Sequence, residues 1–459
     1  MSKASLPKGT RDFTPTEMVR RNFIFSTVRK NFERFGFMPI ETPAMEKLET
    51  LTGKYGEEGD QLIFKILNNG DYLSKANEEA LQERDSKALS FSISKKALRY
   101  DLTVPFARFV VMNQASVAYP FKRYQIQPVW RGDRPGKGRY QEFYQCDVDI
   151  IGSDSLLNEV ELVQIFDSVL SELKIPGFEI RLNNRKILSG IAEVANVGDK
   201  WVDMTTAIDK LDKIGWEGVS KELTERGIDD QATEKIREFL NIEGSMKEQL
   251  EKVDQMLANS EAGRKGVDEL RTIIDYLEAV GLNSSNPVFD PTLARGLDYY
   301  TGTIFEVAVK DSGIGSICGG GRYDDLTGIF GLQGVSGVGI SFGADRIYDV
   351  MEEMNLFPEN MSTTTQLLFV NFGDAEAKFC MGLLKDLRSK GVNAEIFPES
   401  AKMKKQMKYA DNKQIPFVAI VGSREMESGK IAVKNMTTGE QSEVPVEKLT
   451  DFLNQNINE

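Results

Sequence analysis

The segment that most restricts the fold is residues 119–152, YPFKRYQIQPVWRGDRPGKGRYQEFYQCDVDIIG. Two runs of strand-forming residues flank a loop that contains glycines, a pattern that predicts a long antiparallel hairpin. The residues at odd positions of the second strand share one face of the sheet. They are Phe143, Gln145, Asp147 and Asp149. A face that carries an aromatic ring, an amide and two carboxylates is not expected to pack into a hydrophobic core. We therefore expect it to line a polar cavity. The alternative is a sheet face that is simply exposed to solvent.

Helical and extended patterns alternate around this hairpin. Apolar residues recur at helical spacing in residues 16–36, and residues 155–174 are also expected to be helical. The stretch GFMPIETPAMEK, residues 36–47, carries two prolines, which suits an edge strand or an interface better than a central strand. Residues 70–97 are polar, and we expect an irregular, mobile excursion there.

The residue composition and the expected secondary structure change at about residue 190 and again after about residue 360. Residues 190–285 are charged and poor in strand signals, which predicts an inserted helical module, and strand character resumes at 287–309. After about residue 360, strands and helices alternate as in an α/β domain with a mixed sheet. The predicted divisions are a first part of the core at 1–185, a helical insertion at 186–286, a second part of the core at 287–358 and a C-terminal α/β domain at 366–459.

The chain contains no histidine among its 459 residues. This excludes nucleophile pairs and metal sites that use imidazole, and leaves chemistry to carboxylates, arginine, lysine, tyrosine, backbone amides or a diffusible metal ion. Cys146, Cys318 and Cys380 stand far apart, which favours a reducing compartment over a structural zinc site. Since no stretch resembles a signal peptide or a membrane span, we expect a cytoplasmic protein with no membrane partner.

The net charge of −13 argues against a general polyanion binder. Residues 366–459 carry as many basic as acidic residues, so the whole negative excess falls on the first 365 residues. A basic run lies in this neutral C-terminal part. It consists of Lys402, Lys404, Lys405 and Lys408. The run is either a solvated helix face or a face that contacts phosphates.

Several side chains near glycine-rich segments are candidates for ligand binding. Arg131 stands at the end of the first hairpin strand, where a fixed guanidinium could bind a phosphate or carboxylate bidentately; an ordinary basic loop is the alternative. The stretch GVSGVGISFGADR lacks the spacing of a dinucleotide-binding loop. We expect instead a strand that a flat ligand can approach, then a helix that begins near Asp345 with Arg346 in its first turn. In CGGGRYDDL, Arg322 and Tyr323 are expected to project near the ligand.

The stretches PIETPAME, WRGDRPGKGRYQEFYQ and GVGISFGADR are similar to motifs 1, 2 and 3 of class II aminoacyl-tRNA synthetases. RGLDYYTG and CGGGRYDDL resemble the two signature peptides of the histidyl-tRNA synthetase family, and LRYDLTVPFARFV resembles its amino-acid-binding strand. The six stretches follow one another in order over nearly the whole chain. The resemblance implies an α+β fold: a class II synthetase catalytic core on an antiparallel sheet, with a helical insertion, and a C-terminal α/β anticodon-binding domain.

The resemblance also implies a reaction and its partners. ATP, used as a substrate together with Mg²⁺, would convert L-histidine to histidyl-adenylate with release of pyrophosphate. The histidyl group would then pass to the 3′ end of tRNA(His). The C-terminal domain would read the anticodon, and the hairpin loop at 134–139 would meet the acceptor end. The family resemblance further implies a homodimer, with the motif 1 strand at the interface. Pairs of acidic residues could bind Mg²⁺ alongside ATP, but no spacing in the sequence marks a dedicated metal site.

The site residues are carried over from the family motifs. Three arginines are implied in catalysis at the reacting phosphates: Arg131, Arg295 and Arg346. ATP would be bound by Arg131, Asp133, Phe143 and Arg346, with Phe143 stacked on adenine and Arg346 on the γ-phosphate. Histidine would be bound by Asp101, Thr103, Arg131, Gln145, Asp149, Arg295, Tyr299, Tyr300 and Tyr323. Within that set, Asp101 and Thr103 would hold the ammonium group.

Three other kinds of protein are compatible with some of these sequence motifs. A synthetase-like subunit that regulates ATP phosphoribosyltransferase is the non-enzyme alternative, but such paralogues generally lack the C-terminal domain. A class II synthetase for threonine or proline is another, and RGLDYYTG argues against it. A domain that only binds RNA is the third alternative, but it leaves the arginine of motif 3, Arg346, unexplained. We also hypothesise that a chain without histidine can still be translated when charged tRNA(His) is scarce, with chance drift as the alternative.

Overall fold

The computed structural model describes residues 4–294, 299–310, 312–358 and 361–457. The chain divides into two compact units. The first comprises Met1–Arg11 and Ile24–Leu356, and the second comprises Asp12–Phe23 and Phe357–Glu459. Helix α1 (Pro15–Arg34) contributes residues to both units. Within the described ranges, no helix is both long enough and apolar enough to cross a bilayer.

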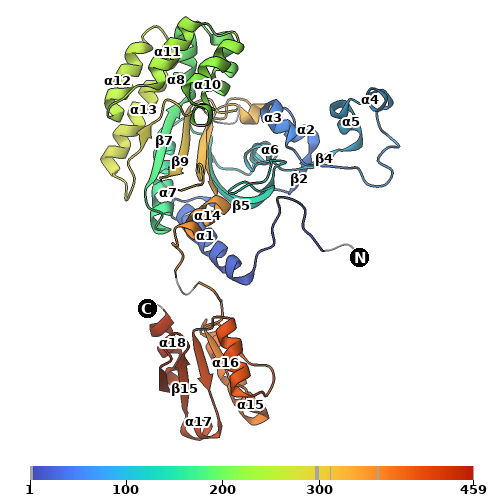
Figure 1. Ribbon diagram of the computed structural model, residues 1–459, viewed down its shortest axis with the longest axis vertical. Coiled ribbons are helices and arrows are strands. Elements are labelled where there is room, and N and C mark those ends of the chain that lie inside the picture. Colours follow the sequence, from blue (N-terminus) through green and yellow to red (C-terminus); the bar gives the residue numbers. More distant parts are fainter. Residues whose placement is uncertain (1–3, 295–298, 311, 359–360, 458–459) are drawn as a thin grey trace. The chain divides into compact units, whose positions relative to one another are not determined.

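The first unit is built on an eight-stranded sheet (Figure 1). Neighbouring strands run antiparallel, except for the parallel pairs β1–β5 and β7–β8. In spatial order the strands are β1 (Met38–Pro39), β5 (Phe121–Trp130), β6 (Glu142–Ile151), β11 (Gly337–Gly343), β10 (Cys318–Tyr323), β9 (Thr303–Val309), β7 (Phe178–Asn184) and β8 (Val288–Phe289). The β5–β6 pairing confirms the predicted hairpin, and β1 lies at the sheet edge, as the two prolines of residues 36–47 predict.

The two faces of the sheet differ as the alternation of residues predicts. Cys146 and Val148 of β6 are fully buried, and Cys146 lies opposite Phe342 of β11. The ring centroid of Phe342 lies 5.8 Å from that of Phe32 in α1 and 5.3 Å from that of Phe166 in α7 (Leu157–Glu172). These two helices therefore cover one face of the sheet, and the polar residues at odd positions of β6 point to the other face.

Six helices occupy the segment predicted to be a helical insertion, and they gather at one end of the large sheet (Figure 1). Helix α13 buries an apolar stripe that includes Val267, Leu270 and Ile273. It meets α8 closely, because a Cβ on Gly190 would lie 2.7 Å from the Cα of Gly263. The domain boundaries stay a prediction. The helices are α8 (Arg185–Val194), α9 (Trp201–Ile208), α10 (Leu211–Glu225), α11 (Asp230–Leu240), α12 (Met246–Met256) and α13 (Glu261–Val280).

The prediction of an irregular segment at residues 70–97 is wrong, because two short helices form there. In the first, the Asn77 side chain accepts a hydrogen bond from the Ala80 N–H at 3.0 Å, and in the second Asp85 accepts one from Ala88 at 3.0 Å. Figure 1 shows both helices projecting beyond a small three-stranded sheet. The helices are α4 (Glu78–Glu83) and α5 (Ser86–Ile93), and the strands are β2 (Met45–Lys47), β4 (Lys96–Leu98) and β3 (Lys65–Ile66).

The remaining helices of the first unit frame the open face of the large sheet or cover its core. They are α2 (Leu48–Leu51), α3 (Gly56–Gln61), α6 (Thr103–Asn113), α7 (Leu157–Glu172) and α14 (Ala344–Glu353). Helix α6 buries Val104, Phe106 and Val110. Its first turn follows the LRYDLT stretch, so packing of the helix fixes the polar residues that precede it.

The second unit is an α/β domain with a mixed sheet, as predicted. Strand β12 (Leu367–Phe369), which has a neighbour on each side, buries both of its faces: Leu367 and Phe369 belong to one apolar cluster and Leu368 to another. The strands, in spatial order, are β13 (Ala394–Ile396), β12 (Leu367–Phe369), β14 (Phe417–Ile420), β15 (Lys430–Asn435) and β16 (Gln441–Pro445). The helices are α15 (Asp374–Ser389), α16 (Met403–Asn412), α17 (Ser423–Ser428) and α18 (Leu449–Ile457).

Candidate active site

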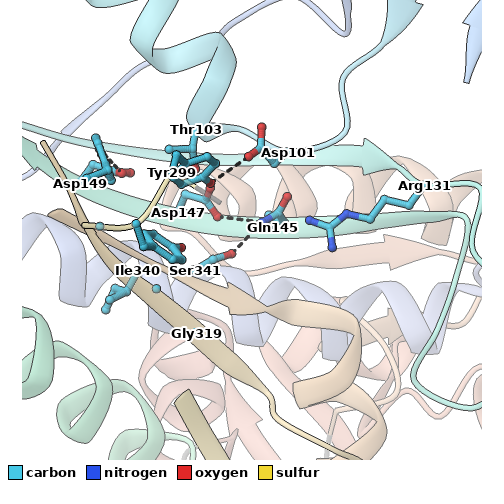
Figure 2. Close-up of a pocket in the computed structure, with 14 residues that line it drawn as sticks. Asp101, Thr103, Arg131, Gln145, Asp147, Asp149, Tyr299, Gly319, Ile340 and Ser341 are labelled. Carbon is cyan, nitrogen blue, oxygen red and sulfur yellow. Dashed lines mark hydrogen bonds between the residues drawn. The ribbon is translucent and has the colours of Figure 1, made fainter. Parts of the chain in front are cut away.

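A pocket opens on the polar face of the large sheet, over the neighbouring strands β6 and β11 (Figure 2). Its walls combine three carboxylates, three tyrosines and an arginine. The lining residues are Asp101, Thr103, Arg131, Gln145, Asp147, Asp149, Tyr299, Tyr300, Gly319, Gly320, Tyr323, Gly339, Ile340 and Ser341. The predicted polar cavity is therefore confirmed, and eight of the residues named from the family motifs meet in it.

Asp101 stands just before α6 and is almost completely buried. Its carboxylate accepts hydrogen bonds from the Tyr55 hydroxyl at 2.8 Å, the Tyr299 hydroxyl at 3.2 Å and the Val104 N–H at 3.2 Å. Burial raises the pKa of Asp101, while these hydrogen bonds and the charge on Arg131 oppose the rise. Tyr55 was not predicted from the sequence, in which it lies 46 positions from Asp101.

Asp149 is held at both of its carboxylate oxygens. The Tyr323 hydroxyl donates to Oδ1 at 2.6 Å, and Nη2 of Arg123 lies 2.7 Å from Oδ2. Arg123 is fully buried, with its guanidinium carbon 4.1 Å from the ring centroid of Phe106. Burial raises the pKa of Asp149, and the charge on Arg123 opposes that rise. The sequence interpretation missed Arg123, although the hairpin register places it directly opposite Asp149.

Gln145 and Asp147 extend the polar row of β6 toward Arg131 (Figure 2). The Gln145 amide donates to Ser341 Oγ at 3.0 Å and, more weakly, to Asp147 Oδ1 at 3.5 Å. Asp147 is 2% exposed, and burial raises its pKa to about 7 against the lowering effect of Arg123. A carboxyl group with this pKa is partly protonated near neutral pH, so its charge can change when a ligand enters.

Glycines let the strands and side chains of this site approach closely. A Cβ on Gly339 would lie 2.0 Å from Oδ1 of Asp149, and one on Gly320 would lie 2.2 Å from the backbone oxygen of Gly339. These glycines make room for protein atoms, and Gly319, Gly320 and Gly339 also line the pocket. The approach of a flat ligand to this strand stays a prediction. Strand β11 has antiparallel neighbours on both sides, whereas a dinucleotide-binding unit needs parallel strands.

Arg131 follows β5 and is held in place, as predicted. Its Nε donates to the backbone oxygen of Tyr100 at 3.1 Å. Its guanidinium carbon lies 4.3 Å from the ring centroid of Tyr100 and 5.3 Å from that of Phe143. Figure 2 shows the guanidinium extending toward Gln145 at the side of the pocket. A cation fixed in this way is preorganised for an anionic group of a ligand.

The remaining predicted residues lie elsewhere. Arg346 is in the first turn of α14, as predicted, where it donates to the backbone oxygens of Gly138 at 3.0 Å and Ser316 at 2.6 Å. Among the described residues, Arg346, Asp133 and Phe143 are placed outside the pocket lining. Arg295 lies outside the described residues. The roles assigned to all of these residues stay predictions.

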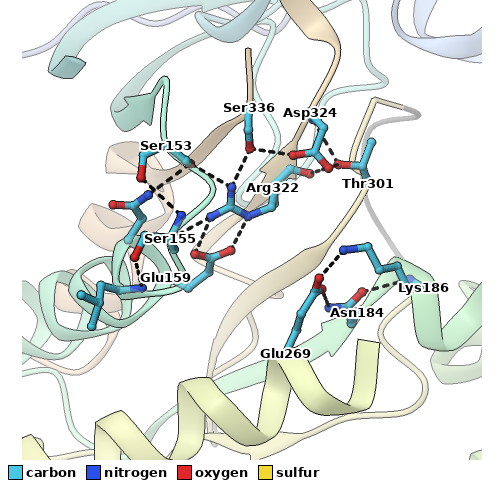
Figure 3. Close-up of polar contacts among 12 residues, drawn as sticks. Ser153, Ser155, Glu159, Asn184, Lys186, Glu269, Thr301, Arg322, Asp324 and Ser336 are labelled. Carbon is cyan, nitrogen blue, oxygen red and sulfur yellow. Dashed lines mark hydrogen bonds and ion pairs between the residues drawn. The ribbon is translucent and has the colours of Figure 1, made fainter. Parts of the chain in front are cut away.

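The prediction that Arg322 projects near a ligand is wrong (Figure 3). Arg322 and Tyr323 are successive residues of β10, so their side chains point to opposite faces, and only Tyr323 lines the pocket. Arg322 Nε and Nη2 donate to the Glu159 carboxylate at 2.5 and 2.7 Å, and Nη1 donates to Ser336 Oγ at 2.6 Å. Arg322 therefore belongs to a buried ion pair beneath the sheet.

The fold and the site together define a class of protein. A polar pocket on a mainly antiparallel sheet, with Arg131 at the end of a hairpin strand and Arg346 in the first turn of the helix that follows β11, is the arrangement expected of a class II aminoacyl-tRNA synthetase. A family model described as histidyl-tRNA synthetase matches residues 92–347, and one described as anticodon binding domain matches residues 366–456. The chain belongs to the histidyl-tRNA synthetase family.

Individual relatives agree with this assignment. The chain is 57% identical to a histidine–tRNA ligase of Phocaeicola vulgatus over 98% of both chains. It is also 57% identical to one of Bacteroides fragilis, over 98% of this chain and 99% of that one. A crystal structure of histidyl-tRNA synthetase from Nostoc sp. PCC 7120 is 32% identical, with a TM-score of 0.85 over 99% of this chain and 100% of that one.

Proposed function

We propose that this chain activates L-histidine with ATP, forming histidyl-adenylate and pyrophosphate, and then transfers histidine to the 3′ end of tRNA(His). The observation that carries the proposal is the pocket on β6 and β11. A fixed guanidinium stands at one side of it, and buried carboxylates together with tyrosine phenols make up much of its polar lining. Such a lining suits an amino acid with a small, polar, flat side chain and disfavours an apolar one.

The orientation of histidine follows from the charges. Arg131 would bind the substrate carboxylate, and Asp101 with Thr103 would bind the ammonium group. The imidazole would then lie among the remaining polar groups. These are Gln145, Asp149, Tyr299, Tyr300 and Tyr323. Because a substrate without ring nitrogens would leave these groups unpaired, the site can discriminate by about 10⁴ to 10⁵.

The activation step needs no base from the protein, because the attacking carboxylate of histidine is already ionised at neutral pH. Catalysis then rests on positioning and on cations placed where charge develops. Arg131 and Arg295 would act at the α-phosphate, and Arg346 at the γ-phosphate. Phe143 would stack on adenine, and Asp133 would complete the ATP site. The absence of histidine from the chain costs nothing in this mechanism.

ATP would bring Mg²⁺ with it. Among the residues that the structure describes, no three acidic or cysteine side chains come together as a metal cage. Mg²⁺ keeps most of its water and binds chiefly through substrate phosphates in many ATP sites, so this lining is compatible with an ion that arrives on the nucleotide.

Transfer to tRNA is proposed to use both units. Residues 1–185 and 287–358 would form the catalytic core, interrupted by the insertion at 186–286, and residues 366–459 would bind the anticodon. The lysines of the basic run are exposed on and beside α16, as phosphate contacts require. The hairpin loop at 134–139 would contact the acceptor end.

We also infer a homodimer whose interface includes β1. This strand is at the edge of the large sheet, and its Met38 is 63% exposed. Met45 of β2 is 51% exposed. Large apolar side chains at a sheet edge favour association with a second chain. Sedimentation equilibrium would give twice the chain mass of 51.5 kDa, and a monomer at assay concentrations would contradict the inference.

A cytoplasmic location completes the proposal. All three cysteines are free and buried, which suits a reducing compartment. Fractionation of cells that express the tagged chain would place it with the cytosolic markers, and recovery with secreted or periplasmic proteins would contradict this.

The test is tRNA charging. The full chain, supplied with ATP, Mg²⁺ and unfractionated tRNA, should attach labelled histidine to one acceptor species and no other labelled amino acid. Attachment of threonine or proline would identify a different class II synthetase. A folded chain that charges nothing but stimulates an ATP phosphoribosyltransferase would identify the regulatory paralogue.

A further inference from the structure

The pocket holds one carboxylate that nothing in the proposed binding mode uses. Asp101 is hydrogen-bonded by two tyrosines and a backbone N–H, and both oxygens of Asp149 are held by Arg123 and Tyr323. Among the described residues, the partners of the third carboxylate, Asp147, are Gln145, at a long 3.5 Å, and Ser341, through a hydrogen bond. It is nevertheless 2% exposed and lines the cavity.

Among the described residues, no cation forms an ion pair with Asp147, because the nearest buried arginine is paired with Asp149. It lies on β6, opposite Ser341 of β11 and Gln125 of β5. The charged and titratable groups that face it from its own strand and the packed elements are Asp149, Arg123, Arg99, Asp101 and Tyr300. Arg123 is the cation with the largest effect on Asp147, and it lies 2.7 Å from Asp149. Two carboxylates therefore share one buried arginine.

The binding of histidine, as proposed above, pairs the other charges of the pocket and leaves Asp147 without an ion-pair partner. The ammonium group neutralises Asp101, and the carboxylate neutralises Arg131, so these two pairs cancel. Asp149 and Arg123 also cancel. The other buried cation near Asp147, Arg99, donates to the backbone oxygens of Pro128 and Thr42 and to the Gln127 side chain, with no ion pair to Asp147 in the part of the chain that the structure describes. The two titratable groups left to contact each other are therefore Asp147 and the imidazole. A buried carboxylate beside a neutral ring would be costly, whereas a proton held between them removes the cost.

We propose that Asp147 is a specificity-determining residue that shares one proton with the imidazole of bound histidine, so that the pocket selects a side chain able to carry that proton. The proton stays within the pair: it resides either on the Asp147 oxygen, which then donates to a ring nitrogen, or on that nitrogen, which then donates to the carboxylate. This inference rests on the proposed function and names a residue that the family motifs did not supply.

The pH dependence of binding follows from the two partners. In the free protein the pKa of Asp147 is raised to about 7 by burial, and the free imidazole has a pKa of about 6.5. Above pH 7 neither partner is protonated, so binding takes one proton from solvent, and the Kd for histidine rises by up to about tenfold per pH unit. Below about pH 6 both are protonated and binding must release one proton, so affinity falls again.

Titration calorimetry of histidine into the full chain without ATP tests this directly. At pH 8, in two buffers of different ionisation enthalpy, the wild type should take up close to one proton per histidine bound. Asp147→Asn should abolish the uptake, weaken binding and flatten the rise of Kd above pH 7. Asp349→Asn, which removes another partly buried carboxyl group of the same unit, is the matched control and should leave the uptake unchanged.

The possible outcomes separate the two proposals. Wild-type binding without proton uptake, or full uptake in Asp147→Asn, would overturn the inference while leaving histidine binding intact. No binding of histidine to the wild type would overturn the proposed function as well. If Asp147→Asn does not fold, 2-fluorohistidine, whose ring is a much weaker base, replaces it. Whichever partner carries the proton, the weaker ring base makes a weaker hydrogen bond, so the wild type should bind this analogue markedly more weakly than histidine at pH 8, and equal affinity would refute the shared proton.

Discussion

The buried pair of Arg322 and Glu159 gives the most quantitative prediction (Figure 3). The side chain of Glu159 is fully buried and that of Arg322 is 5% exposed, and two hydrogen bonds of 2.5 and 2.7 Å join them. Replacing Arg322 by methionine would keep much of the side-chain volume but leave the Glu159 charge buried without a partner. Removal of one member of such a pair costs about 3–5 kcal/mol. We expect Arg322→Met to lower the free energy of unfolding of the first unit by this amount.

Tryptophan fluorescence during urea denaturation measures this change selectively. The three tryptophans, Trp130, Trp201 and Trp216, all belong to the first unit, so the signal reports only on that unit. The matched control is Arg322→Met combined with Glu159→Met. Because this double variant has no buried charge at the site, it should recover most of the lost stability. A single variant within about 1 kcal/mol of wild type, or a double variant less stable than the single one, would refute the reasoning.

The same pair should also affect the pocket. Ser336, which accepts from Arg322, donates to Asp324 at 2.6 Å, and Asp324 accepts from Thr301 at 2.6 Å. Thr301 directly follows Tyr300, so the network anchors the tyrosines of the pocket. If the Arg322→Met variant folds, it should therefore have a higher KM for histidine and a nearly unchanged KM for ATP.

Three further predictions concern the site and the composition. Gly339→Ala would place a Cβ 2.0 Å from an Asp149 oxygen and should raise the KM for histidine at least about tenfold, whereas Gly198→Ala, which meets nothing within 4 Å, should not. Arg131→Lys loses the planar, bidentate donor and should lower kcat for pyrophosphate exchange by about 10²–10³-fold; a change under threefold would contradict its role. Lys221→His on an exposed helix should reduce synthesis of the chain during histidine starvation relative to Lys221→Gln, and equal synthesis would disprove the translational hypothesis.

Regular patterns explain what the sequence could predict. The alternation around Gln145 and Asp149 identified a polar strand face, because a period of two fixes the face without any knowledge of the partner strands. The position of Arg346 followed from a strand that ends in glycine before a helix. The C-terminal domain was recognisable because its buried parallel strands are short apolar runs between amphipathic helices.

Contacts between distant segments explain what the sequence interpretation missed. Tyr55 reaches Asp101 only through packing of the small helices near α6, which no local pattern encodes. Arg123 was accessible in principle, since the hairpin register that pairs Phe121 with Ile151 also pairs it with Asp149. The error at Arg322 had a local cause: adjacent strand residues were assigned to the same side of the chain.

The two helices at 70–97 illustrate a different limit. The helices have six and eight residues, which is too short for an apolar pattern to repeat over several turns. The signals that remain are the capping residues Asn77 and Asp85, each of which accepts hydrogen bonds from the following N–H groups. Capping patterns therefore deserve weight in polar segments, where hydrophobic periodicity is weak.

The most direct test of the account is pyrophosphate exchange into ATP, measured with each of the twenty amino acids and without tRNA. The account predicts exchange with histidine alone, because only its side chain satisfies the acids and phenols of the pocket. Exchange with a different amino acid would contradict the assignment of the pocket residues. No exchange with any amino acid, from folded protein, would contradict the proposed activation step itself.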